Sequence, residues 1–135
     1  MTTPYPLAGQ RARAEDVSPT AWAAMTLLNS WSNTGGGVVT AQWRVLPLEN
    51  MLEVIGNIVH ANIAGGGASQ IATMTDTPAS QQNFLCNVTA TANLYASSTP
   101  QMPRLLLTTA GALFLENLPA NTTGADFHGF FSLDA

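Results

Sequence analysis

Lysine is absent from the sequence, and charged residues of any kind are scarce. Only 9% of the 135 residues are charged, and the four cations are all arginines: Arg11, Arg13, Arg44 and Arg104. Nucleic-acid binding needs cations that displace counterions from phosphates, so this set predicts no nucleic-acid partner. The lack of lysine also excludes a Schiff-base or P-loop lysine. With a formal net charge of −4, the surface is expected to be hydrated mainly by 40 Ser, Thr, Asn and Gln residues.

Cysteine and long apolar runs are also lacking. The single Cys86 cannot form an internal disulfide or a cysteine-based zinc cluster. No apolar run approaches the roughly 20 residues that span a bilayer, so we expect no membrane partner. The N-terminal segment has no apolar stretch flanked by basic residues, and we expect no secretory signal. The hydrophobic fraction of 46% argues against disorder, and the length fits one domain.

The first 20 residues differ in composition from the rest. They contain Pro4, Pro6 and Pro19, two of the four arginines, and the acidic pair Glu15 and Asp16. Proline favours extended backbone, so residues 1–20 are predicted to form an N-terminal arm ahead of a β-sandwich domain at 21–135. Two interpretations stay open, a frayed terminus or an arm that docks onto a neighbouring subunit.

From Trp22 onward the hydrophobic pattern has a period of two, which is typical of half-buried strands. A hairpin is expected around Ala110-Gly111, and a bulge or bend near Gly56. The expected strands are Val39–Val45, Leu52–Ile63, Phe84–Leu94, Leu105–Thr109, Ala112–Leu118 and 126–134, the last with Phe127, Gly129, Phe131 and Leu133 on one face.

Short strands between turn-rich loops predict an all-β fold, an antiparallel β-sandwich or jelly roll. Several strands, such as Leu105–Leu107 and 130–131, offer apolar side chains to both faces. Exposed apolar patches usually mark subunit interfaces, so we expect a homo-oligomer.

Catalytic motifs are missing from this pattern. No G-x-S-x-G sequence occurs, and Cys86 is expected to be a small buried hydrophobe. Asp126 and His128 share a strand face, and His60 is a possible third metal ligand; the alternative, which we prefer, is a surface histidine beside a carboxylate. We therefore predict no enzyme, no catalytic residues, no metal and no cofactor.

Sugar binding is the ligand chemistry that is hardest to exclude from the sequence. Trp31 and Tyr95 lie at strand–loop borders, next to hydroxyl, amide or glycine residues, and are candidate ligand-binding residues. The alternative for Trp22, Trp31 and Trp43, which we prefer, is that they fill the core or a subunit interface, where buried aromatics are common.

Several segments together resemble a known group of proteins. They are Ala8-Gly9-Gln10, Ala14-Glu15-Asp16-Val17, Trp22, Thr26-Leu27-Leu28-Asn29-Ser30-Trp31-Ser32-Asn33, Ala41-Gln42-Trp43-Arg44, Val54-Ile55-Gly56 and Ser132-Leu133-Asp134-Ala135. This pattern is similar to that of small tail-associated proteins of phages and prophages of actinobacteria.

The resemblance implies a homotrimeric receptor-binding or tail-fibre head on the virion surface. Such a head adheres to host cell-surface polysaccharide, and its arm docks to other virion proteins. An alternative is a capsid decoration protein that stabilises the shell at local three-fold axes. A third reading is a free carbohydrate-binding module whose arm has no assembly role.

Overall fold

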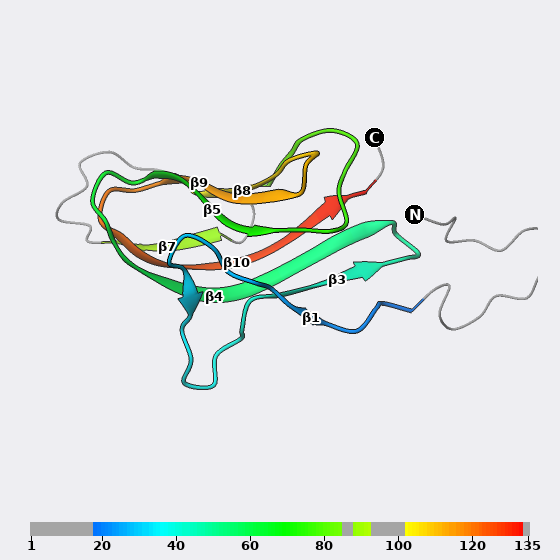
Figure 1. Cartoon of the computed structure of the whole chain (residues 1–135), viewed down its shortest axis with the longest axis horizontal. Helices are drawn as coiled ribbons and strands as arrows, with labels where there is room; N and C mark the ends of the chain where they lie inside the picture. Colours follow the sequence, from blue (N-terminus) through cyan, green and yellow to red (C-terminus); the bar gives the residue numbers. More distant parts are fainter. Residues whose placement is uncertain (1–17, 85–87, 93–101, 134–135) are drawn as a thin grey trace, which may run out of the picture.

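A computed structural model describes residues 18–84, 88–92 and 102–133 of the chain (Figure 1). Cys86, Tyr95 and most of the predicted arm lie outside the described residues. Every regular element in the described part is a strand, and none is a helix. The strands are β1 (Ala23–Ala24), β2 (Ser32–Asn33), β3 (Gln42–Leu46), β4 (Met51–Ile63), β5 (Gly67–Thr73), β6 (Gln82–Phe84), β7 (Val88–Ala92), β8 (Arg104–Leu107), β9 (Ala112–Leu118) and β10 (Thr122–Ser132).

The strands form two antiparallel sheets, which confirms the predicted all-β class. The first sheet has the order β1-β3-β4-β10-β7, with β2 also paired to β4. The second has the order β5-β9-β8-β6. Figure 1 shows β5, β8 and β9 in one layer, beside the layer of β3, β4 and β10. The arrangement is that of a β-sandwich. Along the strand order, the chain changes sheet between β4 and β5, β6 and β7, β7 and β8, and β9 and β10.

The core contains the inward-facing side chains of both sheets. On β4 and β10, alternate residues are buried, as the period of two predicts. The fully buried large side chains include Leu52, Val54, Ile58 and Phe131 from the first sheet and Ile71, Leu105, Leu107, Leu113 and Leu115 from the second. Burial of one such side chain contributes about 1.5–3 kcal/mol to folding, so this layer is the main source of stability.

The predicted hairpin around Ala110-Gly111 is confirmed. Strands β8 and β9 pair in antiparallel register from Arg104↔Glu116 to Leu107↔Leu113. Gly111 has a φ of +88°, and a Cβ at this position would lie 2.3 Å from the carbonyl oxygen of Met74. Only glycine fits this turn, because it combines a left-handed backbone with close approach of another chain segment.

The bulge predicted at Gly56 is wrong. Pairing of β4 with β10 runs without a shift through Gly56↔Phe127, and the register changes only between Thr122 and Gly124. Glycine is used here for space, since a Cβ on Gly56 would lie 2.8 Å from the Phe127 ring and 2.9 Å from the Cα of Ala41. The break in alternation therefore marks close packing across the sheet.

Three predicted strands also differ from the structure. The predicted strand 126–134 corresponds to β10, which begins four residues earlier, at Thr122. The predicted strand Val39–Val45 begins only at Gln42. Residues 34–41 before it form a loop, in which Gly35, Gly36 and Gly37 adopt positive φ.

Of the predicted strand Phe84–Leu94, the described residues belong to two strands in different sheets: Phe84 ends β6, which pairs with β8, and Val88–Ala92 form β7, which pairs with β10. Residues 85–87 and 93–94 of this prediction lie outside the described residues. Alternation continues across such a crossing, so the pattern alone does not reveal it.

Candidate functional site

The outer face of the first sheet carries the polar side chains that the core excludes. On β4, Leu52 and Val54 point into the sandwich, so Glu53 between them points outward. On β10, Phe127 and Phe131 are buried, and His128 between them lies on the same outer face as Glu53. Strand alternation thus gathers residues distant in sequence on one surface.

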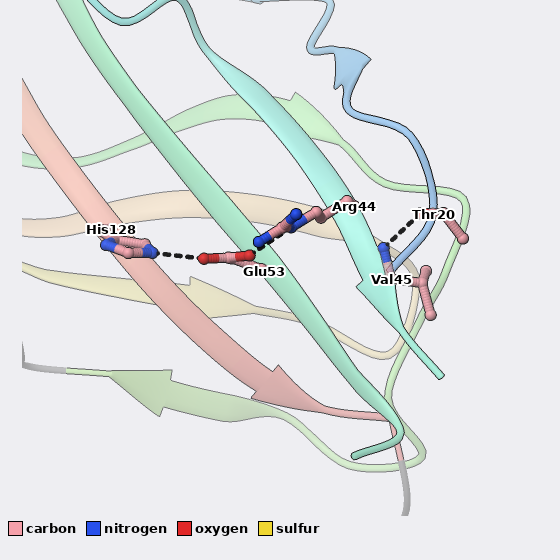
Figure 2. Close-up of polar contacts among 5 residues, drawn as sticks. All are labelled: Thr20, Arg44, Val45, Glu53 and His128. Atoms are coloured by element: carbon pink, nitrogen blue, oxygen red, sulfur yellow. Dashed lines mark hydrogen bonds and ion pairs between the residues drawn. The ribbon is translucent and has the colours of Figure 1, made fainter. Parts of the chain in front are cut away.

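Arg44, Glu53 and His128 form a row across β3, β4 and β10, called the Glu53 row below. Arg44 Nε donates to Glu53 Oε1 at 2.6 Å, and His128 Nε2 lies 2.7 Å from Glu53 Oε2. Figure 2 shows the carboxylate between the two, with one oxygen toward each. Because an ionised carboxylate only accepts hydrogen bonds, Nε2 is the protonated nitrogen of His128. Each oxygen of the buried carboxylate therefore has a donor.

The electrostatics of Glu53 follow from this arrangement. The residue is only 6% exposed, and burial by itself raises the pKa of its carboxyl group. Hydrogen bonds from His128 and Arg44, together with the charges of those groups, outweigh burial and hold the pKa of Glu53 below its ordinary value. The carboxyl group is consequently a poor proton donor and a fixed negative charge.

The same row ties the segment before β1 to the sheet. The Arg44 guanidinium lies 4.3 Å from the centroid of the Trp22 ring, a cation–π contact. Thr20 is bonded to Val45 twice, since its N–H donates to the Val45 carbonyl at 2.9 Å and its hydroxyl accepts from the Val45 N–H at 2.8 Å (Figure 2). The chain is therefore held along β3 from residue 20 onward.

Thr34, Asn57 and Asp126 form a second row, the Asn57 row, on the same outer face. The Thr34 hydroxyl donates to the Asn57 amide oxygen, and the Asn57 amide nitrogen donates to Asp126 Oδ1. Asn57 and Asp126 are directly opposite in the β4–β10 register. The amide thus orients the carboxylate of an exposed residue.

An open groove lies between the loop that precedes β3 and the strands β4 and β10. Its volume is about 410 Å³, and its lining consists of residues 37–39, residues 55–57 and residues 126–128. We call it the outer groove. A second hollow of about 170 Å³ adjoins it and shares Asn57 and Asp126. The volume of the outer groove falls in the range of about 300–1,000 Å³ that is common for small-molecule sites.

The residues predicted from sequence occupy different places. Trp31 is 4% exposed and lies in the core, where its Nε1 donates to Ser69 Oγ at 2.9 Å. Its ring also contacts the ring of His60, with centroids 4.9 Å apart. The other candidate, Tyr95, lies outside the described residues.

Asp126 and His128 do share a face, but each has a separate partner there. His60 does not join them, and its Nε2 instead lies 2.8 Å from the carbonyl oxygen of Asn29. Within residues 18–84, 88–92 and 102–133, no three His, Cys, Asp or Glu side chains are grouped as metal ligands would be. The same part of the chain contains no helix able to cross a membrane.

Sequence reasoning missed Glu53, Arg44 and Asn57 as parts of one surface. The available signal was a glutamate among the apolar residues of the predicted strand Leu52–Ile63, which requires a partner if that strand is buried.

Comparison with protein-family models found no match, and comparison with curated proteins found no significantly similar sequence.

Proposed function

We propose that the chain is a phage virion protein, a tail-fibre or receptor-binding head that adheres to host cell-surface glycan as a homotrimer. The observation that carries the proposal is the outer groove, which combines an apolar wall with an oriented carboxylate, an amide and an imidazole. Saccharides present both apolar C–H faces and hydroxyl groups, so they match this combination. The sequence resemblance to tail-associated proteins supports the same conclusion.

The proposal assigns binding and no reaction to this surface. Glycoside cleavage needs one carboxyl group that holds a proton and a second that is ionised. Here Glu53 is held ionised by Arg44 and His128, and Asp126 is exposed and accepts a hydrogen bond from Asn57. A rigid pair of strands with fixed acceptors is suited to recognition of hydroxyl groups.

Trimer formation is the second part of the proposal. Away from the groove that carries the proposal, large hydrophobic side chains are exposed at Trp22 and Met102. Exposed apolar side chains are the groups that a contact with another subunit would cover. Three sites on one trimer would act together, and avidity would compensate for the weak affinity of each site. The arm at residues 1–20 and the jelly-roll form of the sandwich belong to the same proposal.

Two measurements test this function. Light scattering during gel filtration should give a mass three times the 14.2 kDa of the chain. Quantitative mass spectrometry of purified particles should find a small copy number in multiples of three, as on a tail. Hundreds of copies per particle would overturn adhesion and favour the capsid decoration protein, and absence from the particle would contradict both.

A further inference from the structure

We infer that the outer groove is a binding site for neutral saccharide units, and that the adjoining hollow takes the next unit of the same chain. The inference rests on the proposed function and assigns it a location and a ligand class. Three features support it: the apolar wall, the oriented polar groups, and the continuity of the two hollows across the Asn57 row.

The apolar wall is formed by the loop that precedes β3. Val38 and Val39 are 43% and 46% exposed, and Ile55 of β4 is half-buried beside them. The Asn57 N–H donates to the Val39 carbonyl at 3.0 Å, so this wall is attached to the strand that forms the floor. The C–H face of a sugar ring would cover these side chains and remove apolar surface from water.

The polar side of the groove has free hydrogen-bonding capacity. Asn57 bonds Oδ1 of Asp126, and Oδ2 has no partner among the residues that the structure describes. His128 uses Nε2 for Glu53, and its Nδ1 likewise has no partner there. A carboxylate accepts hydrogen bonds from two neighbouring hydroxyl groups, which is the pattern that a sugar ring presents.

Charge selects the ligand class. The groove contains the acidic side chain of Asp126, and the formal net charge of the chain is −4, so an anionic ligand would be repelled. A neutral saccharide avoids this cost and supplies hydroxyl donors to the carboxylate. Because both hollows share Asn57 and Asp126, one saccharide chain can contact this pair from both sides.

The test uses the full chain, labelled with ¹⁵N and titrated in amide NMR spectra. The probes are glucose, galactose, mannose, arabinose and N-acetylglucosamine, followed by polysaccharide extracted from actinobacterial cell walls. We expect shifts at the amides of residues 37–39, 55–57 and 126–128. Val39→Arg, which fills the groove, and Asp126→Asn, which removes the carboxylate charge, should each weaken binding about tenfold or more.

Leu48→Arg is the matched control, because Leu48 is 38% exposed and lies in the β3–β4 turn, outside the groove lining. This variant should bind as the unmodified chain does. Unfolding in urea establishes that all three variants are folded before binding is compared.

Other outcomes would overturn the inference in distinguishable ways. If polysaccharide binds but Val39→Arg has no effect, the groove is the wrong site and the proposed adhesion stands. If Val39→Arg dissociates the oligomer while Leu48→Arg does not, the groove is a subunit contact. If monosaccharides bind in the groove but the protein is absent from phage particles, the site stands and the proposed function fails. If no probe shifts the groove amides, the saccharide site is contradicted.

Discussion

Glu53 shows how one buried charge organises an exposed sheet face. A carboxylate at 6% exposure loses most of its hydration, which destabilises the fold unless hydrogen bonds replace the lost water. Arg44 and His128 supply those bonds from the two neighbouring strands. The bonds satisfy one group while linking three strands, so the row fixes side-chain positions beside the outer groove.

Removal of one partner should therefore be costly. His128→Ala is expected to lower the free energy of unfolding by about 1–3 kcal/mol, because one oxygen of Glu53 is left without its donor. His128→Gln keeps an amide N–H that can donate, so its loss should be smaller. Urea unfolding of the three proteins checks this order, and equal stability of His128→Ala and the unmodified chain would show that the bond contributes nothing.

The lowered pKa of Glu53 also predicts a pH dependence. Since the folded state favours the ionised carboxylate, its contribution is fully present above the ordinary pKa of 4.5 and is lost as pH falls below this value through the folded pKa. Glu53→Gln removes this titration. The stability difference between the unmodified chain and Glu53→Gln should shrink on acidification, as urea unfolding at a series of pH values would show. A difference that stays constant in acid would contradict the assignment.

Among the elements, β4 and β9 are those that the sequence predicts best, since the predicted strands Leu52–Ile63 and Ala112–Leu118 match their bounds to within one residue. The predicted strand 126–134 misses the first four residues of β10, although its alternation correctly places Phe127 and Phe131 in the core. The β8–β9 hairpin is equally clear because glycine marks its turn. Local patterns are sufficient where strand and turn signals agree.

Other elements depend on contacts that the local pattern does not contain. Gly56 looks like a bulge until Phe127 and Ala41, distant in sequence, are placed against it. Val39 continues the alternation of β3 but lies before its first residue, Gln42, in the loop that follows three glycines with positive φ. The local pattern alone does not show where an alternating segment stops being a strand and becomes an exposed loop.

Only part of the candidate site was predictable from the sequence. Period two places Asp126 and His128 on one face, and the structure agrees. Their partners Asn57 and Glu53 are 69 and 75 residues away along the chain, so only the strand order brings them together. That order was outside the reach of sequence reasoning.

The role of Gly56 gives a prediction at the scale of the strand. Gly56→Ala should destabilise the fold by about 1–3 kcal/mol, because the new methyl group would overlap the Phe127 ring and the Ala41 backbone. Gly65→Ala is the matched control, since a Cβ there meets nothing within 4 Å. Thermal and urea unfolding of both variants test this, and equal stability would mean that the strands adjust at no cost.

In the whole molecule, the two sheets differ in the side chains that they contribute. The second sheet packs its leucines against the first, which carries the polar rows, the outer groove and the contacts of Thr20 and Trp22 on its outer side and edge. The segment that leads to the predicted arm is thus fixed to the sheet that bears the proposed binding site. The proposed assembly and recognition roles therefore both concern the first sheet.

The final prediction separates folding from assembly. Deletion of residues 1–17 leaves the Thr20–Val45 bonds and the Trp22–Arg44 contact in place, so the free energy of unfolding should change by no more than about 0.5 kcal/mol. Deletion of residues 1–24 removes these contacts and β1, and should cost about 1–3 kcal/mol. Urea unfolding of the two truncated proteins measures both values.

The shorter deletion then tests the arm itself. If residues 1–17 dock the head onto other virion proteins, particles that encode the truncated chain should lack it, although it folds and forms the same groove. Quantitative mass spectrometry of those particles gives the answer. Incorporation at full copy number would remove the docking role of the arm. If the two deletions lowered the free energy of unfolding equally, the contacts of Thr20 and Trp22 would not separate the residues that stabilise the fold from those that serve assembly alone.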